Sequence, residues 1–272
     1  MNGIKSGFVL VRGAGDLGTG VIVRLSKAGF LVVALETERP SVIRRTVSLA
    51  EAMYEGRTEV EGVRAVRVET PEAAMSALAR GVVPILADPE CGCLSEWKPA
   101  ALVDAILAKR NLGTRIGMAP VVVALGPGFE AGRDAHAVVE TNRGHDLGRV
   151  LTSGSAEPDT GIPGVIGGFG AERVLRSPIA GAIEPLCGIG DFRRKDEPVF
   201  AVSGKTRAVV TCPFDGIVRG MIRPGYPAEA GLKVADVDPR CRREHCFSVS
   251  DKARAIGGGV LEYLLARGVL PT

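Results

Sequence analysis

The sequence predicts an α/β protein with an N-terminal parallel sheet, a small C-terminal β-sandwich and a terminal helix. In the first half of the chain, short apolar runs alternate with helical patterns. In the second half, residues 177–202 and 212–237 align without a gap at an offset of 35 residues. An amphipathic pattern over residues 250–267 predicts the last helix.

The N-terminal elements follow one another in a regular order. The expected strands are 8–11, 30–36, 62–68, 82–87 and 121–125, and the expected helices are 16–28, 42–54, 71–80 and 99–109. Alternation of this kind predicts a Rossmann-like, mostly parallel sheet with helices on both faces, and we assign it to residues 1–170.

A glycine-rich segment, GAGDLGTG (13–20), separates the first strand from the first helix. Gly-x-Gly-x-x-Gly between a strand and a helix is the pattern that places a pyrophosphate on a helix N-terminus. Glu36, 23 residues after Gly13, could hold a ribose hydroxyl. Asp16 places a carboxylate where dinucleotide phosphates would lie, although it would also cap the helix. The segment therefore predicts a binding loop and leaves its ligand open.

A second polar segment, HAVVETNRGHDLGRV (136–150), contains two of the three histidines. Arg143 and Arg149 could form a fork for phosphate or carboxylate, and His145 beside Asp146 could transfer a proton. A solvated loop with a helix-capping aspartate would explain the same residues. The candidate cofactor-binding residues are Gly13, Gly15, Asp16, Gly18, Thr19, Glu36, Arg143 and Arg149.

The cysteines give a weak signal for a metal site. DPECGC contains Cys91 and Cys93, and DPRCRREHC contains Cys241, His245 and Cys246. Neither spacing is that of a zinc ribbon, and about 150 residues separate the two clusters, so we expect no metal site. Cys246, with His145 and Asp146, stays a candidate catalytic residue. The sequence contains no Gly-x-Ser-x-Gly elbow, Walker lysine loop or His-Glu-x-x-His pattern, so nothing specific supports a hydrolase or an NTPase.

Composition limits the possible partners. The 34 basic and 31 acidic residues are spread along the chain, and eight Phe, three Tyr and one Trp provide few stacking surfaces, so nucleic acid is not expected. The longest apolar stretch, 116–129, is too short to span a bilayer and is interrupted by two prolines. Six cysteines without the density of a disulfide scaffold fit a reducing cytoplasm.

The repeat defines the second expected domain, residues 171–240, after a glycine-rich segment (153–170) that is either a linker or a functional loop. Each half reads as strand, glycine turn and second strand, and two such halves usually interlock. The pair resembles biotinyl and lipoyl carrier domains, which predicts a barrel-sandwich-like β module. Lys205 has the position of the carrier lysine, but Ser-Gly-Lys-Thr lacks the Met or Asp beside the carrier lysine, so we expect it to be unmodified.

The C-terminal segment, residues 241–272, is expected to pack its helix back on the α/β domain. Three consecutive glycines, 257–259, lie inside the predicted helix and weaken it by roughly 1 kcal/mol each relative to alanine. Close approach of another backbone or a ligand would account for them, and so would a break between two shorter helices.

Several strings together resemble one family. They are GAGDLGTG with VIVRLSKAGF, RRTVSLAEAMYEG with VEGV, MAPVVVALGPGF, VVETNRGHDLGRV, and SDKARAIGGGVLE. They are similar to the YqeB family, accessory proteins of selenium-dependent molybdenum hydroxylases, over nearly the whole chain. The resemblance implies a cytoplasmic role in maturing a molybdenum enzyme, with that hydroxylase or its maturation proteins as partners. It carries no catalytic residues over to this chain.

Three functions follow from these observations. The first is an accessory protein that binds the molybdenum cofactor, or a related nucleotide or anionic ligand, through the glycine loop and the 143–149 segment. The second is a nucleotide-dependent oxidoreductase that uses Glu36 for ribose. The third is a non-catalytic scaffold that docks the hydroxylase. The sequence leaves open whether the protein is an enzyme, which ligand it binds and how many subunits it has.

Overall fold

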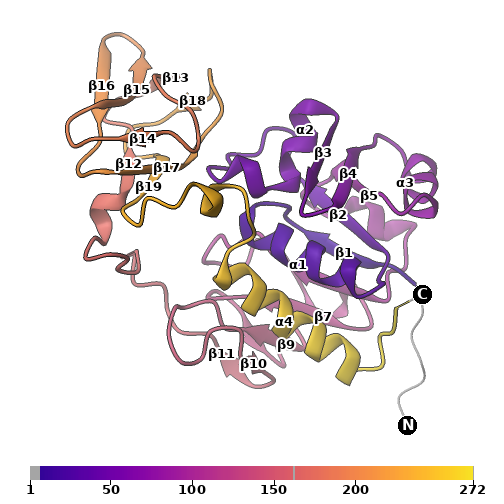
Figure 1. Ribbon diagram of the computed structural model, residues 1–272. Helices are drawn as coiled ribbons and strands as arrows, with labels where there is room; N and C mark the ends of the chain where they lie inside the picture. Colours follow the sequence, from indigo (N-terminus) through magenta and orange to yellow (C-terminus); the bar gives the residue numbers. More distant parts are fainter. Residues whose placement is uncertain (1–6, 162, 272) are drawn as a thin grey trace. The chain divides into compact units, whose positions relative to one another are not determined.

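The computed structural model describes residues 7–161 and 163–271, and the chain divides into two compact units (Figure 1). Unit 1 contains residues 7–40, 48–159 and 249–271, and unit 2 contains residues 41–47 and the described part of 160–248. In the division into compact units, the chain passes from one unit to the other near residues 40, 47, 159 and 248. Whether residues 1–170 and 171–240 fold as independent domains stays a prediction.

Unit 1 is built on a nine-stranded sheet in the order β10-β9-β7-β6-β1-β2-β5-β4-β3. Its strands are β1 (Val9–Arg12), β2 (Val32–Glu36), β3 (Arg57–Val60), β4 (Val63–Arg67), β5 (Val83–Ala87), β6 (Ala101–Asp104), β7 (Val122–Leu125), β9 (Ala137–Val139) and β10 (Val150–Leu151). Its α-helices are α1 (Asp16–Lys27), α2 (Ala52–Glu55), α3 (Pro71–Ala79) and α4 (Asp251–Ala266). A separate two-stranded sheet pairs β8 (Glu130–Ala131) with β11 (Gly154–Ser155).

The prediction of a Rossmann-like parallel sheet was wrong, because the sheet is mixed. The seven inner strands, in the order β9-β7-β6-β1-β2-β5-β4, are all parallel. Both edge strands are antiparallel to their neighbours, β3 to β4 and β10 to β9. At the β3 edge, Glu61 and Gly62 both have positive φ, which suits a tight hairpin. A connection this short can join only antiparallel strands, so it fixes the direction of β3.

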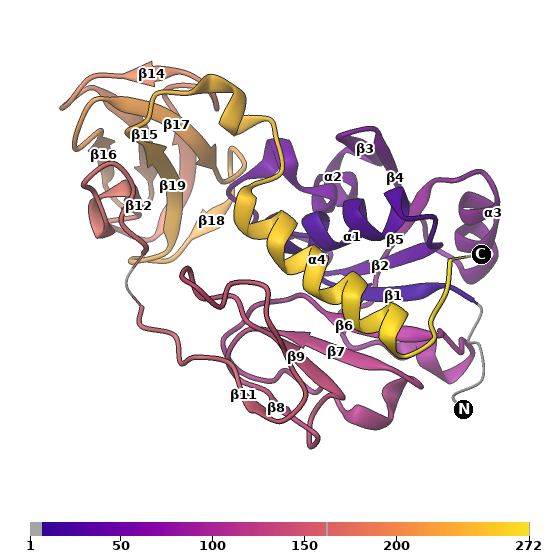
Figure 2. The same cartoon turned by 60° about the horizontal axis from the view of Figure 1, so that its bottom comes forward.

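The two faces of this sheet are covered differently. Helix α4 packs on the face of Val139, and α1 lies beside α4 (Figure 2). Because side chains alternate along a strand, Leu10 and Leu102 point to the opposite face. There they form a core with α3 and with irregular segments that include Trp97 and Phe129.

Two predicted helices did not form. Residues 42–54 contain the short 3₁₀ helices η1 (Arg45–Val47) and η2 (Leu49–Glu51) before α2. Ser48 is extended, and its hydroxyl donates to the carbonyl of Ala14 at 2.9 Å, so tertiary hydrogen bonds replace helical ones. Residues 99–109 contain strand β6, which is completely buried between β1 and β7. Burial in the sheet outweighed the helical pattern.

Unit 2 consists of two four-stranded antiparallel sheets around one apolar core that includes Ile183, Phe200 and Val218. One sheet has the order β12-β19-β17-β14 and the other β16-β15-β13-β18. The strands are β12 (Val174–Arg176), β13 (Gly181–Pro185), β14 (Phe192–Arg193), β15 (Pro198–Ser203), β16 (Arg207–Thr211), β17 (Gly216–Met221), β18 (Pro227–Ala228) and β19 (Lys233–Asp238).

The prediction of a biotinyl/lipoyl-like β-sandwich is not supported. The two repeat halves exchange short strands, since β14 of the first half pairs with β17 and β18 of the second half pairs with β13, but the aligned segments alone do not complete either sheet. Strands outside the aligned segments complete the sheets, since β12 joins one and β16 the other. Lys205 lies in the exposed turn between β15 and β16, and its chemical state stays a prediction.

Among the described residues, none of the helices has the length and apolar character needed to cross a membrane.

Candidate functional site

The glycine loop lies where β1 ends and α1 begins, at the carboxyl edge of the parallel strands. Ala14 and Thr19 are buried, whereas Gly15 and Asp16 are partly exposed. A Cβ at Gly13 would lie 2.9 Å from the carbonyl oxygen of Ala105, and one at Gly18 would lie 2.1 Å from the carbonyl oxygen of Gly13. These two glycines therefore allow close packing of the loop, the helix and the segment after β6.

Gly15 has a different environment. It is the N-cap of α1, with φ −64° and ψ −173°, and a Cβ built on it would meet no atom within 4 Å. The prediction that Asp16 caps the helix was wrong, because Asp16 is the first helical residue and α1 has no side-chain cap. Asp16 still lies in the first turn, where a carboxylate is stabilised by the helix dipole. The open space beside Gly15 lies at the N-terminus of α1, where unpaired backbone N–H groups favour an anion.

Glu36 and Thr19 both hold the loop in place. One carboxylate oxygen of Glu36 accepts from the backbone N–H of Ala14 at 3.0 Å, and the other accepts from the backbone N–H of Thr37 at 2.7 Å. The hydroxyl of Thr19 donates to the carbonyl of Ala14 at 2.9 Å and accepts from the N–H of Leu49 at 2.8 Å. Because both side chains make these contacts, their role in this structure is to support the loop.

The 140–149 segment connects β9 to β10 at the same edge of the sheet. Glu140 is buried, and one of its oxygens accepts from the N–H groups of Thr141 and Asn142, at 2.6 Å each. The other accepts from the N–H of Glu157 at 2.8 Å. This carboxylate therefore fixes the start of the loop and joins it to the segment after β11.

The arginines expected to form a fork are each paired separately. Arg143 makes two 2.8 Å hydrogen bonds to the carboxylate of Asp251, in the first turn of α4. Arg149 pairs with Asp146 at 2.8 Å inside the loop. His145 is exposed between them. The structure thus connects Arg143 to α4, and it gives Arg149 and His145 no link to the glycine loop among the contacts it describes.

Helices α1 and α4 run in the same direction with their backbones in close contact. A Cβ at Gly20 would lie 2.8 Å from the carbonyl oxygen of Ala253, and one at Gly257 would lie 2.9 Å from the carbonyl oxygen of Gly20 and 3.1 Å from the Cβ of Arg24. As α1 advances from residue 20 to 24, α4 advances from 253 to 257. Both helices therefore begin at the same edge, and their positive dipole ends point to one region.

Lys252, which our sequence analysis did not single out, lies in this region. It is partly buried in the first turn of α4. Burial, together with the nearby charge of Arg143, lowers the pKa of Lys252, and the carboxylates of Asp16, Glu140 and Asp159 oppose that effect. Asp16 and Arg143 thus both lie within electrostatic range of one ammonium group. A lysine two residues after the cap Ser250 and five residues before a glycine run was the available sequence signal.

The remaining candidate, Cys246, belongs to unit 2 and is completely buried, with its sulfur 3.8 Å from the carbonyl oxygen of Val218. Burial raises the pKa of its thiol, which keeps it protonated at neutral pH. Burial also raises the pKa of Cys91, to about 11. Within the described part of the chain, no three His, Cys, Asp or Glu side chains form a group that could hold a metal ion.

Comparison with known proteins gives one strong match. The chain is 50% identical over 257 residues to the protein YqeB of Escherichia coli (strain K12), an alignment that covers 94% of this chain. This similarity supports the YqeB family name. The chain spans about half the length of that curated relative, 47%. No protein-family model matches the chain.

Solved structures give only weak likenesses. A succinylglutamate desuccinylase/aspartoacylase from Rhodobacter sphaeroides is 13% identical and aligns with 76% of this chain and 57% of its own, with a TM-score of 0.26. An aspartoacylase family protein from Mesorhizobium loti is 13% identical over 86% of each chain, with a TM-score of 0.29. Scores this low do not establish a shared fold.

Proposed function

We propose that this chain is a cytoplasmic accessory protein in the maturation of a selenium-dependent molybdenum hydroxylase. In this role it would bind the phosphate of the molybdenum cofactor, or of a related nucleotide, at the edge where α1 and α4 begin. The observation that carries the proposal is the convergence of two helix N-termini, with the open position at Gly15 on one and the partly buried Lys252, within electrostatic range of Asp16, on the other.

The charges at the edge where α1 and α4 begin favour an anionic ligand. Two helix N-termini and Lys252 attract a phosphate. Arg143 is paired with Asp251 at a partly exposed position, and exposed pairs are worth only about 0–1 kcal/mol, so its guanidinium could turn to a ligand at little cost. Asp16 repels a phosphate unless a cation lies between them, and Lys252 is within range to do so.

The same contacts argue against a nucleotide-dependent oxidoreductase that reads ribose through Glu36. Both oxygens of that carboxylate already accept backbone hydrogen bonds, from Ala14 and Thr37. A ribose hydroxyl would have to displace one of them or share its acceptor. A ligand recognised mainly through its phosphate requires no such rearrangement.

Mass spectrometry of small molecules released from native protein tests the proposal. Wild-type protein should release a phosphate-bearing pterin or nucleotide. Gly15→Val, which places a branched side chain beside the first turn of α1, should release none, while Gly258→Ala, whose Cβ also meets open space, should behave like wild type. Ligand-free wild-type protein from cells that make the hydroxylase would contradict the proposal.

Calorimetry with the released ligand refines the site. Lys252→Gln removes a charge-assisted interaction worth about 1.5–3 kcal/mol, so binding should weaken by roughly 10- to 100-fold. Asp16→Asn should bind the ligand more tightly, because it removes a repulsive charge from the first turn of α1. An unchanged affinity in both variants would place the ligand elsewhere.

A further inference from the structure

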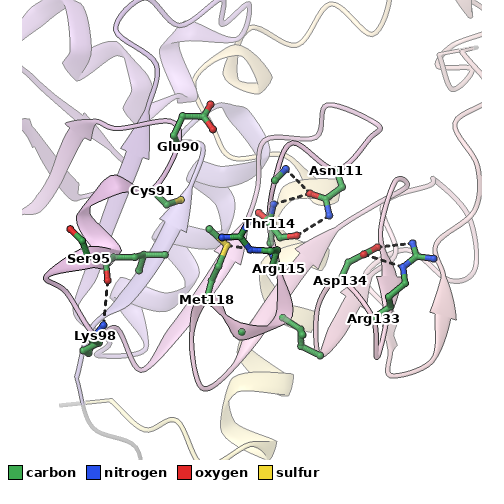
Figure 3. A pocket seen from close by; sticks show the side chains of 14 residues that line it. Glu90, Cys91, Ser95, Lys98, Asn111, Thr114, Arg115, Met118, Arg133 and Asp134 are labelled. Atoms are coloured by element: carbon green, nitrogen blue, oxygen red, sulfur yellow. Dashed lines mark hydrogen bonds and ion pairs between the residues drawn. The ribbon is translucent and has the colours of Figure 1, made fainter.

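Unit 1 contains a cavity apart from the edge where α1 and α4 begin, and of the residues discussed above only Cys91 lines it. It has a volume of about 890 Å³, within the size range of small-molecule sites. Figure 3 shows the segment with Cys91, Ser95 and Lys98 and the segment with Arg115 and Met118 that together line it. The first segment follows β5 and the second follows β6, so both walls come from loops that continue parallel strands.

A single buried arginine holds the two walls together. Arg12, at the end of β1, donates to the carbonyl of Pro89 at 2.8 Å on one side and to the carbonyl of Leu112 at 2.8 Å on the other. It also donates to the hydroxyl of Thr114 at 3.0 Å and to the carboxylate of Asp104 at 3.3 Å. Since Arg12 and Thr114 are almost completely buried, buried hydrogen bonds hold the two lining segments together.

The charged residues around the cavity differ in whether they already form an ion pair. Arg133 is bound to Asp134 by hydrogen bonds of 3.1 and 2.9 Å, and the carboxylate of Glu90 lies 4.0 Å from Arg12. Lys98 and Arg115 are exposed and make no ion pair among the residues that the structure describes; the ammonium of Lys98 donates one long hydrogen bond, of 3.4 Å, to the carbonyl of Leu94, and Glu90 adds one exposed carboxylate to the lining. Two positive charges, one from each of the two lining segments, are therefore available to a ligand.

The rest of the lining is apolar or neutral. Leu94, Ile116 and Met118 contribute apolar surface. Cys91 lies on the wall with its thiol buried, and that burial raises its pKa to about 11, so it adds no negative charge at neutral pH. An apolar surface with two cations at its margin suits an organic anion whose body is apolar.

We propose that this cavity binds a small organic anion, a carboxylate or phosphate monoester with an apolar body, through Lys98 and Arg115. The proposal does not depend on the function proposed above, because the two sites share no residue. The ligand's anionic group would lie between the two cations, and its apolar body would contact Leu94, Ile116 and Met118.

The fluorescence of Trp97 can report ligand binding in this cavity. Trp97 is the only tryptophan of the chain and lies between the lining residues Ser95 and Lys98, packed edge-on against Phe8 with ring centroids 5.6 Å apart. Its fluorescence should respond to a bound ligand. Benzoate and benzylamine have similar size and opposite charge, so a titration with each separates charge recognition from simple filling of an apolar cavity.

Benzoate should change Trp97 fluorescence saturably, and benzylamine should not. The double variant Lys98→Gln, Arg115→Gln should weaken benzoate binding by at least on the order of tenfold. Gly117→Leu, at a lining glycine whose Cβ would meet no atom within 4 Å, should abolish the response, while Gly258→Leu, also open but on α4, should keep it. Circular dichroism of each variant verifies folding.

Three results would overturn the proposal. The first is no saturable response of the wild type to benzoate, and the second is an equal response to benzylamine. The third is unchanged benzoate binding by the folded Gly117→Leu variant or by the double variant. Because the two charge substitutions are on exposed side chains, the double variant tests the proposal even if Gly117→Leu fails to fold.

Discussion

The three consecutive glycines of α4 provide a test of how this helix is held on the sheet. A Cβ at Gly259 would lie 2.2 Å from the carbonyl oxygen of Gly148 and 3.1 Å from Cγ1 of Val139. A Cβ at Gly258 would meet nothing within 4 Å. The two positions are adjacent in one helix and share its backbone conformation, so Gly259→Ala and Gly258→Ala differ only in packing.

The expected effects have opposite signs. Alanine is favoured over glycine inside a helix by roughly 0.5–1 kcal/mol, so Gly258→Ala should stabilise the protein by that amount. At Gly259 the same gain is outweighed by overpacking against backbone, which typically costs about 1–3 kcal/mol. We therefore expect Gly259→Ala to unfold at a lower urea concentration than wild type and Gly258→Ala at a higher one.

Urea unfolding followed by Trp97 fluorescence measures both effects in unit 1, which contains Trp97 and α4. Far-UV circular dichroism provides an independent signal from the helices. Equal shifts of the two variants would refute the reasoning, because they would show that α4 does not approach the Gly148 loop as closely as described.

Two further predictions concern titration and thiol chemistry. Hydrogen bonds from Arg133 lower the pKa of Asp134 in the folded protein, so their stabilising contribution is present above about pH 4 and is lost as pH falls through the folded-state pKa. The difference in urea midpoint between wild type and Asp134→Asn should shrink in acid, and a constant difference would refute this. Native protein treated with a thiol reagent should be labelled at exposed Cys241 well before buried Cys246, as peptide mass spectrometry can determine. Equal labelling rates would contradict the burial of Cys246.

Local patterns predicted the elements that depend on neighbouring residues. The strand, glycine loop and helix at residues 9–27 form as expected, and so does the terminal helix, whose cap Ser250 accepts from the N–H of Ala253 at 3.1 Å. The glycines inside that helix were expected to indicate close backbone approach or a break. The helix is continuous, and Gly257 and Gly259 face other backbones.

Long-range partners were not predictable in this way. The extended conformation of Ser48 depends on the carbonyl of Ala14, 34 residues earlier in the chain, and no local pattern contains that hydrogen bond. Glu36 has the position expected of a ribose-binding residue, and only the structure shows that its oxygens bind backbone N–H groups. Sequence spacing can place a side chain at an edge, but it cannot show which acceptors are already used.

Packing and chemistry are coupled at the edge where α1 and α4 begin. The glycines at positions 20 and 257 let the two helix backbones come closer than residues with a Cβ would allow. That distance sets how near Lys252 is to the carboxylate of Asp16, since each side chain lies in the first turn of its helix. A wider spacing would leave two separate helix ends, each a weak anion site on its own. The glycine run of α4 therefore has a physical role in the proposed site, although none of its residues carries a functional group.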